Sequence, residues 1–260
     1  MIRPREPLPT RVSDTPHLPE PYARTLDAGL RELGLALSDE ARIEIDGHAR
    51  LLLAWTTAVN LTAIRDPVDV ARLHVLDSLA AVALLRLRGV EQLIDLGSGG
   101  GYPGIPLAAA LRARALLVES VGKKATFLET VVAATGLAGR VDVAPVRAES
   151  LGARVAATRA TAVTARAVGS LADLVELAFP VLAPGGRLVA WKRGPIDDEL
   201  AAAREAAGAL GDGRVEVHSI LPSVLSGHLL VEIEKRAPTP RGFPRDPAAR
   251  RRRPWGTPLC

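Results

Sequence analysis

Residues 94–104 of the chain read Ile-Asp-Leu-Gly-Ser-Gly-Gly-Gly-Tyr-Pro-Gly, an apolar stretch that runs directly into a glycine-rich one. The apolar run from Gln92 to Gly97 predicts a buried β-strand, and Gly104–Leu111 reads as the helix that follows it. Glycines at such a junction let the backbone turn sharply and approach a ligand that a Cβ would exclude. Ligands of open parallel sheets bind at the carboxyl ends of the strands, so this loop is the first candidate binding site.

Strand-like and helix-like segments alternate along most of the remaining chain. Further β-rich segments lie at Ala115–Ser120, Val141–Val146, Thr161–Ala165, Gly186–Lys192, Arg214–Ile220 and His228–Glu234. Helical patterns lie at Lys123–Thr135, Leu171–Phe179 and Asp197–Leu210. Alternation of this kind predicts an α/β fold with a doubly wound parallel sheet. Only a loop separates the last two strands, so they must pair antiparallel. A seven-stranded, Rossmann-like sheet that ends in an antiparallel hairpin is typical of methyltransferases.

The glycine loop is compatible with two ligands. Gly99–Gly104 satisfies G-x-G-x-x-G and Glu119 lies twenty residues after Gly99, which permits a dinucleotide. Counted from Gly97, however, the third glycine position holds Tyr102, which is too large for close packing of helix on strand. Asp95 also puts a carboxylate beside the loop, which would repel a pyrophosphate but suits the cationic S-adenosylmethionine. We therefore favour S-adenosylmethionine, with Glu119 accepting from the hydroxyls of its ribose.

Composition divides the chain into four regions. Residues 1–21 contain six prolines and are predicted to be a disordered leader. Residues 22–90 have helical spacing, with Ser38 as a helix N-cap and Pro67 in a first turn, and are predicted to form an N-terminal helical cap. Residues 91–235 form the predicted S-adenosylmethionine-dependent methyltransferase domain. Residues 236–260 are predicted to be a basic, disordered tail, since six prolines oppose a helix there.

Composition also excludes several classes of protein. No apolar run reaches the roughly 18 residues of a membrane span, and the first ten residues lack the apolar stretch of a secretory signal. The single cysteine, Cys260, excludes intramolecular disulfides and cysteine-based chemistry inside the fold. The histidines lack metal-ligand spacing. We expect a cytoplasmic monomer without a metal and without membrane contact.

The positive charge is concentrated at one end of the chain. Residues 236–260 hold seven arginines and one aspartate, or +6, which leaves 26 basic and 28 acidic side chains, or −2, in residues 1–235. The tail is therefore predicted to be a flexible arm that adds salt-sensitive affinity for RNA. Truncation after Lys235 is expected to weaken RNA binding at low salt and to spare cofactor binding.

Several phrases together resemble one family, the bacterial small-subunit rRNA guanine-N7 methyltransferases, also known as glucose-inhibited division protein B. Two phrases in the cap are the most specific: Asn60–Pro67, which reads NLTAIRDP, and His74–Leu79, which reads HVLDSL. They are followed in order by Asp95–Pro106, Glu119–Lys124, Arg147–Glu149, Thr164–Ala167, Leu182–Gly186 and Trp191–Lys192. Two departures are that Leu73, not arginine, precedes His74, and that Thr161 replaces the usual aspartate.

The resemblance implies transfer of a methyl group from S-adenosylmethionine to N7 of a guanine in the decoding-region loop of 16S rRNA. Gly97, Tyr102, Ala148, Glu149 and Arg166 fall on the cofactor-contacting positions of the family. With the rest of the loop, the predicted cofactor-binding residues are Gly97, Ser98, Gly99, Gly101, Tyr102, Glu119, Ala148, Glu149 and Arg166. The partner that the resemblance implies is 16S rRNA or the small ribosomal subunit.

The chemistry of N7 asks for no acid, base or nucleophile, because guanine N7 already carries a free lone pair. We therefore predict no catalytic residue in that sense, and expect catalysis by positioning. Lys123, Lys124, Lys192 and Arg193 are predicted to contact RNA. His74 is either a helix-packing residue or an RNA contact, and Trp191 either packs in the core or flanks the base. Three alternatives stay open: a methyltransferase acting on another RNA or a small molecule, a nicotinamide-dependent oxidoreductase, and an inactive RNA-binding protein.

Overall fold

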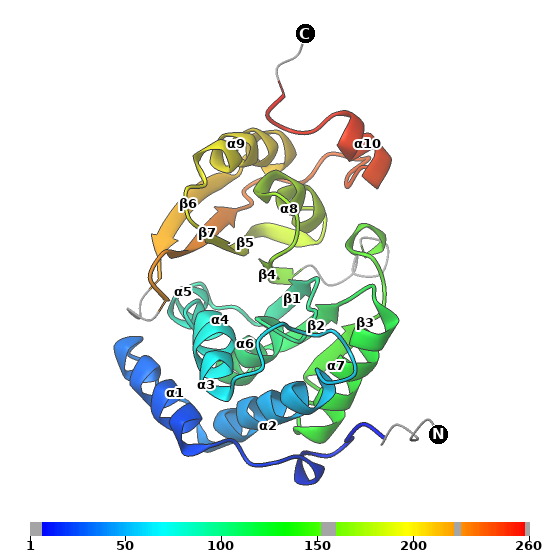
Figure 1. Ribbon diagram of the computed structural model, residues 1–260. Coiled ribbons are helices and arrows are strands. Elements are labelled where there is room, and N and C mark those ends of the chain that lie inside the picture. The colour runs from blue at the N-terminus through cyan, green and yellow to red at the C-terminus, as the bar shows by residue number, and fades with distance from the viewer. Residues whose placement is uncertain (1–6, 152–159, 221–224, 258–260) are drawn as a thin grey trace.

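A computed structural model describes residues 7–151, 160–220 and 225–257 of the chain (Figure 1). The strands are β1 (Gln92–Leu96), β2 (Arg114–Val118), β3 (Val141–Ala144), β4 (Ala160–Arg166), β5 (Leu182–Arg193), β6 (Arg214–Ser219) and β7 (His228–Glu234). The helices of the α/β part are α6 (Gly104–Leu111), α7 (Gly122–Ala134), α8 (Leu171–Ala178) and α9 (Asp197–Gly211). The described helices include none that is both long and apolar enough to cross a membrane.

The strands form one seven-stranded sheet in the order β3-β2-β1-β4-β5-β7-β6. The pairs among β1 to β5 are parallel, whereas β7 is antiparallel to both β5 and β6. The chain leaves β1 toward one edge of the sheet and returns to β4 on its other side. Because strand order reverses between β1 and β4, the switch point lies directly above the glycine loop. The predicted doubly wound, seven-stranded fold with its antiparallel hairpin is confirmed.

Each face of the sheet is covered by its own hydrophobic core. In β1, Leu93 points into the core that holds the cap helices, α6 and α7, whereas Ile94 and Leu96 point into the core under α8 and α9. Successive side chains of a strand point to opposite faces, so a continuous apolar run fits a strand that is buried on both sides. The cap thus adds a layer on the α6 and α7 side of the sheet (Figure 1).

The cap begins with α1 (Glu20–Glu32) and α2 (Asp39–Trp55), and Ser38 caps α2 by accepting from the backbone N–H of Ala41 at 3.2 Å. The third helix starts at Pro67 as predicted, capped by Asp66. It runs as α3 (Pro67–Val70), a π-helical turn (Ala71–Leu76) and α4 (Asp77–Leu79), followed by α5 (Val82–Leu87). The spacing of apolar residues gives no sign of the π-helical turn, a feature often found at functional sites.

The two terminal segments that were predicted to be disordered are ordered where the structure describes them. Residues 7–19 run along α2, where the carbonyl of Pro9 accepts from Trp55 Nε1 at 2.8 Å and that of Pro16 accepts from Arg50 Nε at 2.9 Å. Prolines leave carbonyls free to accept, and α2 supplies the donors. Residues 236–257 fold back on the body and include a helix, α10 (Pro247–Arg252), in which Pro247 occupies the first turn, where proline fits. Residues 1–6 and 258–260, Cys260 among them, lie outside the described residues.

Candidate cofactor and RNA site

The glycine loop turns through three residues in the left-handed region. Gly97, Gly99 and Gly101 have φ of 68°, 54° and 88°, a conformation that side-chain-bearing residues rarely adopt. A Cβ on Gly97 would lie 2.5 Å from Val168 Cγ2, and one on Gly101 would lie 2.8 Å from His48 Nε2. At Gly99 the nearest heavy atom to a Cβ would be the Gly97 carbonyl oxygen at 3.8 Å. A Cβ would therefore clash with neighbouring side chains at Gly97 and Gly101, whereas at Gly99 it would make only an ordinary van der Waals contact.

Asp95 does not line the binding cleft, contrary to the expectation that its carboxylate faces a cationic ligand. It is fully buried: one oxygen accepts from Thr164 Oγ1 at 2.7 Å and the other from the backbone N–H of Gly104 at 3.3 Å. Burial raises the pKa of Asp95 to about 6, although the hydrogen bond from Thr164 lowers it. The strand pleat explains the error, because Asp95 points to the same face as Leu93. Its role is to tie the two ends of the loop to β4.

Glu119 closes the loop from the neighbouring strand. Its two oxygens accept from the backbone N–H groups of Gly99 at 2.9 Å and of Val121 at 2.8 Å. The side chain is 6% exposed and bonds directly to the loop, so the structure brings two of the predicted cofactor residues, Glu119 and Gly99, into contact. Each carboxylate oxygen keeps a second lone pair for another donor.

A cleft of about 580 Å³ opens at the carboxyl ends of β1, β4 and β5, between the sheet and the cap. From the sheet side it is lined by Gly97, Ser98, Gly99, Gly100, Tyr102, Arg166, Ala167, Val168, Leu174, Trp191, Lys192, Arg193 and His228. From the cap it is lined by Leu61, Ile64, Leu73, His74 and Asp77. The volume lies in the range of small-molecule sites. The two cap phrases that are remote in the sequence therefore meet the glycine loop in one cleft.

Arg166 is the centre of a polar network that joins sheet and cap. Its Nη1 donates to Asp77 Oδ2 at 2.8 Å and to the carbonyl of Leu73 at 3.0 Å, and its Nη2 donates to His74 Nδ1 at 3.1 Å. His74 then donates from Nε2 to Thr62 Oγ1 at 2.8 Å. An accepting Nδ1 fixes the neutral tautomer of His74. The network holds the Arg166 guanidinium at the cleft wall.

Tyr102 lies between two imidazoles. Its ring centroid is 4.3 Å from that of His48 and 4.7 Å from that of His74, and both pairs are stacked. Burial lowers the pKa of His48 to about 4. Burial, together with the nearby charge of Arg166, lowers the pKa of His74 to about 3. Both rings are therefore neutral near pH 7, which lets them pack against the aromatic ring next to an arginine.

Asp77 and His228, which were not among the predicted site residues, complete the cleft. Asp77 is 3% exposed, and its Oδ1 accepts from His228 Nδ1 at 2.8 Å. Trp191 is buried and donates from Nε1 to the Asp77 carbonyl at 2.7 Å, so packing is its role in this structure. Asp77 stands in the HVLDSL phrase, which was the available signal, whereas nothing in the sequence links His228 to a site 151 residues away.

The other predicted residues fall into two groups. Lys192 and Arg193 line the cleft, and Lys192 Nζ pairs with Glu199 at 2.6 Å. Lys123 and Lys124 begin α7 and lie outside that lining. Ala148 and Glu149 lie on a 3₁₀ turn (Ala148–Ser150), and Glu149 lines a second cavity, of about 410 Å³, that shares Val168 with the main cleft.

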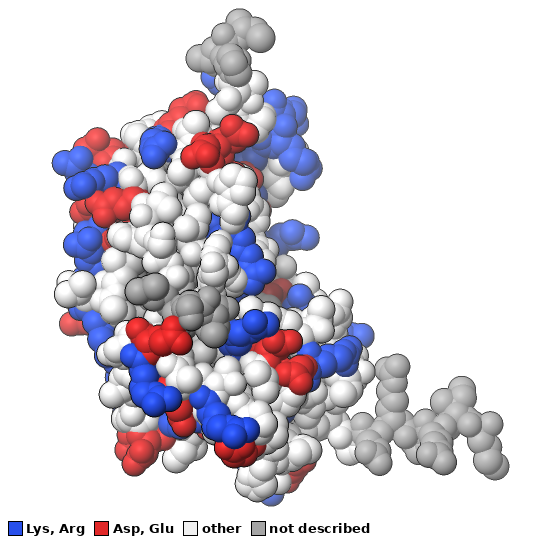
Figure 2. Space-filling model, turned by 60° about the vertical axis from the view of Figure 1, so that its left-hand side comes forward, with Lys and Arg blue, Asp and Glu red and all other residues white. Residues whose placement is uncertain are grey.

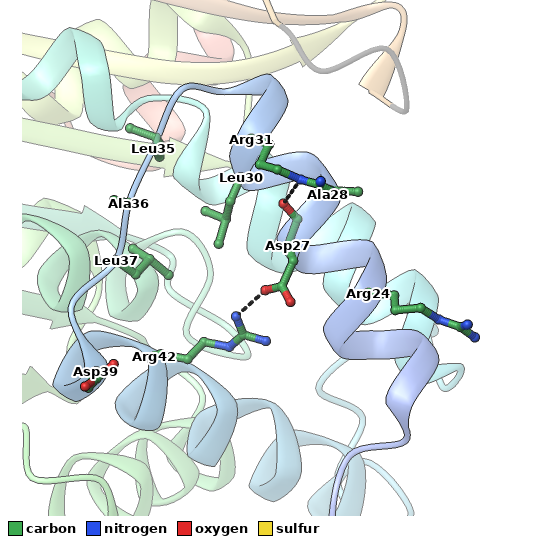
Figure 3. A pocket seen from close by; sticks show the side chains of 10 residues that line it. All are labelled: Arg24, Asp27, Ala28, Leu30, Arg31, Leu35, Ala36, Leu37, Asp39 and Arg42. Carbon is green, nitrogen blue, oxygen red and sulfur yellow. Dashed lines mark hydrogen bonds and ion pairs between the residues drawn. The ribbon is translucent and has the colours of Figure 1, made fainter.

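Two other features are separate from this cleft. A hollow of about 850 Å³ lies between α1 and α2, where Arg42 bonds the Asp27 carboxylate and Arg31 donates to the Asp27 carbonyl at 3.3 Å (Figure 3). It contains no residue of the glycine loop. Glu216, His218 and Glu232 lie close enough together on β6 and β7 to hold a metal ion. Arg88 and Arg187 already pair with Glu232, at 3.2 and 3.1 Å.

The sheet order, the loop and the cleft define the S-adenosylmethionine-dependent methyltransferase fold class. The O-methyltransferase TomG from Streptomyces achromogenes, solved in complex with SAM, superposes with a TM-score of 0.55 at 18% identity, over 83% of this chain and 99% of that one. An O-methyltransferase from Bacillus cereus in complex with SAH gives 0.54 at 16% identity, over 73% and 91%. At such identities the likeness shows the fold alone.

Sequence comparison is more specific. Residues 43–224 match the family described as rRNA small subunit methyltransferase G. A relative of that name from Dehalococcoides mccartyi is 37% identical over 220 residues, which are 84% of this chain and 93% of the relative. Another, from Rubrobacter xylanophilus, is 41% identical over 243 residues, 90% of each chain. The chain belongs to the rRNA small subunit methyltransferase G family.

Proposed function

We propose that this chain is an enzyme that transfers the methyl group of S-adenosylmethionine to N7 of a guanine in the decoding-region loop of 16S rRNA. The observation that carries the proposal is the meeting of the NLTAIRDP and HVLDSL phrases with the glycine loop around Arg166. Family membership supports the rRNA substrate over a small molecule. The nicotinamide alternative has no comparable support.

The residues present fit S-adenosylmethionine. Gly99 lines the cleft, and a second cavity lined by Glu149 lies beyond Val168, so the two spaces together match the length of an elongated ligand. Tyr102 Oη is buried without a hydrogen-bond partner in the described chain, which leaves a polar group for a ligand atom to satisfy. We assign the methionine end to Gly97–Gly101 and Tyr102, the ribose to Glu119, and the adenine to Ala148 and Glu149.

When bound, S-adenosylmethionine supplies an electrophilic methyl group on a sulfonium. The guanine brings its own lone pair at N7, so the chain needs no base to remove a proton. The residues of the cleft act by holding the base in line and by excluding water. Asp77 and His74 hold Arg166 in place before any substrate binds. The Arg166 side chain therefore loses no further conformational entropy when the reaction takes place.

We place the rRNA on the cleft side that Arg193 and Lys192 occupy, with Lys123 and Lys124 as further phosphate contacts. In the view of Figure 2, basic side chains gather near the C-terminal end of the chain, whereas elsewhere on the visible face acidic and basic groups are mixed. Phosphate contacts position a protein on RNA without reading sequence. We infer that the enzyme acts as a monomer in the cytoplasm on 16S rRNA or the small subunit.

The test is mass mapping of N7-methylguanine in 16S rRNA from cells with and without the gene. We expect the mark to vanish on deletion and to return with the wild-type chain. When the deletion strain carries the Arg166→Ala chain, we expect at least about tenfold less methylation than with the wild-type chain, because the cleft loses its fixed guanidinium. Arg214→Ala, which removes an exposed arginine paired only with Glu216, is the matched control. A methylation pattern unchanged by deletion would rule out the rRNA assignment.

A further inference from the structure

The C-terminal segment, residues 241–257, is fastened to α8 and α9 by a buried carboxylate. Glu176 on α8 is fully buried, and it accepts from the backbone N–H of Arg245 at 2.7 Å, from Arg245 Nε at 2.9 Å and from Trp255 Nε1 at 2.7 Å. The Arg245 guanidinium also lies 5.0 Å from the centroid of the Trp255 ring. Gly256 donates to Glu205 on α9 at 2.9 Å. These contacts fix both ends of α10.

The anchored segment carries Arg250 to Glu149. Arg250 Nη2 donates to Glu149 Oε1, and both side chains are largely buried, at 11% and 22% exposed. Glu149 Oε2 is left out of this ion pair. The second terminal nitrogen, Arg250 Nη1, is buried and has no hydrogen-bond partner in the described chain. One oxygen of Glu149 and one terminal nitrogen of Arg250 are therefore left out of the ion pair.

Glu149 and Arg250 both line a second cavity, of about 410 Å³, that shares Val168 with the cofactor cleft. The cavity is lined by Glu149 and Val168 from the body and by Pro247, Arg250 and Pro254 from the C-terminal segment. Val168 also lines the main cleft, so the two spaces lie on either side of that side chain. A purine offers an exocyclic amine to an acceptor and ring nitrogens to a donor. The two free groups match that pair.

We propose that the C-terminal segment forms one wall of the adenine end of the cofactor site, where Arg250 positions Glu149 for the purine amine and offers Nη1–H to a purine ring nitrogen. The inference rests on the proposed function, which assigns the adenine to Glu149. It makes Arg250 a positioning residue for cofactor binding, and it gives the basic tail a role other than RNA affinity. Figure 1 shows α10 beside α8, at the end of the molecule opposite the cap helices.

The experiment is calorimetric titration of the full chain with S-adenosylhomocysteine and with S-inosylhomocysteine, which carries a carbonyl in place of the purine amine. We expect Arg250→Ala to bind S-adenosylhomocysteine about tenfold more weakly, the loss typical of one hydrogen bond to a charged group. We also expect a smaller preference for adenine over hypoxanthine. Arg250→Lys should recover part of the affinity. In a Glu149→Ala background, Arg250→Ala should have less effect, since part of its effect passes through Glu149.

Arg252→Ala is the control, because it removes the same charge from the same helix at an exposed position outside the cavity lining. Unchanged or tighter binding by Arg250→Ala overturns the inference, and tighter binding would mean that Arg250 competes with adenine for Glu149. An equal loss for both ligands with a lowered melting temperature overturns it too, as a folding effect. If the wild-type chain binds no S-adenosylhomocysteine, the proposed function fails along with it. If it binds the cofactor but methylates no rRNA, only the proposed function fails.

Discussion

Asp77 is buried between cap and sheet, and each of its carboxylate oxygens accepts a hydrogen bond from across the cleft. Asp77→Asn removes the charge that Arg166 faces, and breaking such a buried pair costs about 3 kcal/mol or more. We expect urea unfolding to show a loss of that size, together with a large loss of methylation.

Asp69→Asn breaks the Asp69–Arg72 pair, in which the side chains are 43% and 39% exposed. It serves as the control, because exposed pairs contribute less than about 1 kcal/mol. If the Asp77 and Asp69 variants lost the same free energy of unfolding, the buried network around Arg166 would stabilise the fold no more than an exposed ion pair does.

His74 predicts a pH dependence of stability. The pKa of about 3 in the folded chain is below the ordinary value of 6.5, so only the unfolded state binds a proton between these values. Its contribution to stability is therefore complete above about pH 6.5 and is lost as pH falls toward 3. Between pH 7 and 5 the wild type should lose about 2 kcal/mol more than His74→Asn. Urea titrations at the two pH values measure the difference, and parallel losses would contradict it.

At the scale of elements, local sequence patterns specify where strands and helices begin and end, but not which face of the sheet a side chain occupies. The strand that ends at Leu96, the glycines of the loop and the helix start at Pro67 all follow from short-range spacing, and the structure confirms them. Asp95 was assigned to the wrong face, because an apolar strand buried on both sides has no polar face to set its register. The π-helical turn at Ala71–Leu76 leaves no signature in the apolar pattern.

Glu176 makes a prediction about the C-terminal segment as an element. Burial raises the pKa of Glu176, but hydrogen bonds from Arg245 outweigh burial and hold the pKa below its ordinary value. Glu176→Gln should release α10, so trypsin should cut at Arg250–Arg253 at least about tenfold faster than in the wild type. Mass spectrometry of timed digests measures the rate. Glu205→Gln, which loses only the bond from Gly256, should stay close to the wild type, and equal cleavage of all three chains would show that Glu176 does not hold the segment.

For the whole molecule, because the C-terminal segment is folded onto the body, we expect its removal to affect cofactor binding as well as RNA binding. Removing residues 241–260 deletes six arginines and one aspartate, a net loss of +5. We expect weaker rRNA binding, mostly at about 50 mM rather than about 200 mM salt, with a shallower salt dependence. Cofactor binding should also fall about tenfold, where composition alone predicts no change. Filter binding and calorimetry on the same preparations separate the two effects, and an unchanged salt slope would exclude an RNA role for the tail.

The docking of the tail could not be predicted from the sequence, because its partners are remote. Arg245 meets Glu176 from 69 residues away and Arg250 meets Glu149 from 101 residues away. A segment rich in proline and arginine has the composition of a disordered segment. This one is held in a single position by a buried carboxylate, Glu176, from elsewhere in the fold. The family phrases in the cap, in contrast, could be recognised in the sequence because each phrase is contiguous.

Val168, which lines both cavities, has a consequence for the order of events in turnover. A cofactor that spans both spaces would have its reactive end where the RNA arrives and its purine beside α10. Spent cofactor could then leave past the C-terminal segment while the ribosomal substrate is still engaged. Under that arrangement, we expect that release of the spent cofactor does not have to wait for release of the rRNA.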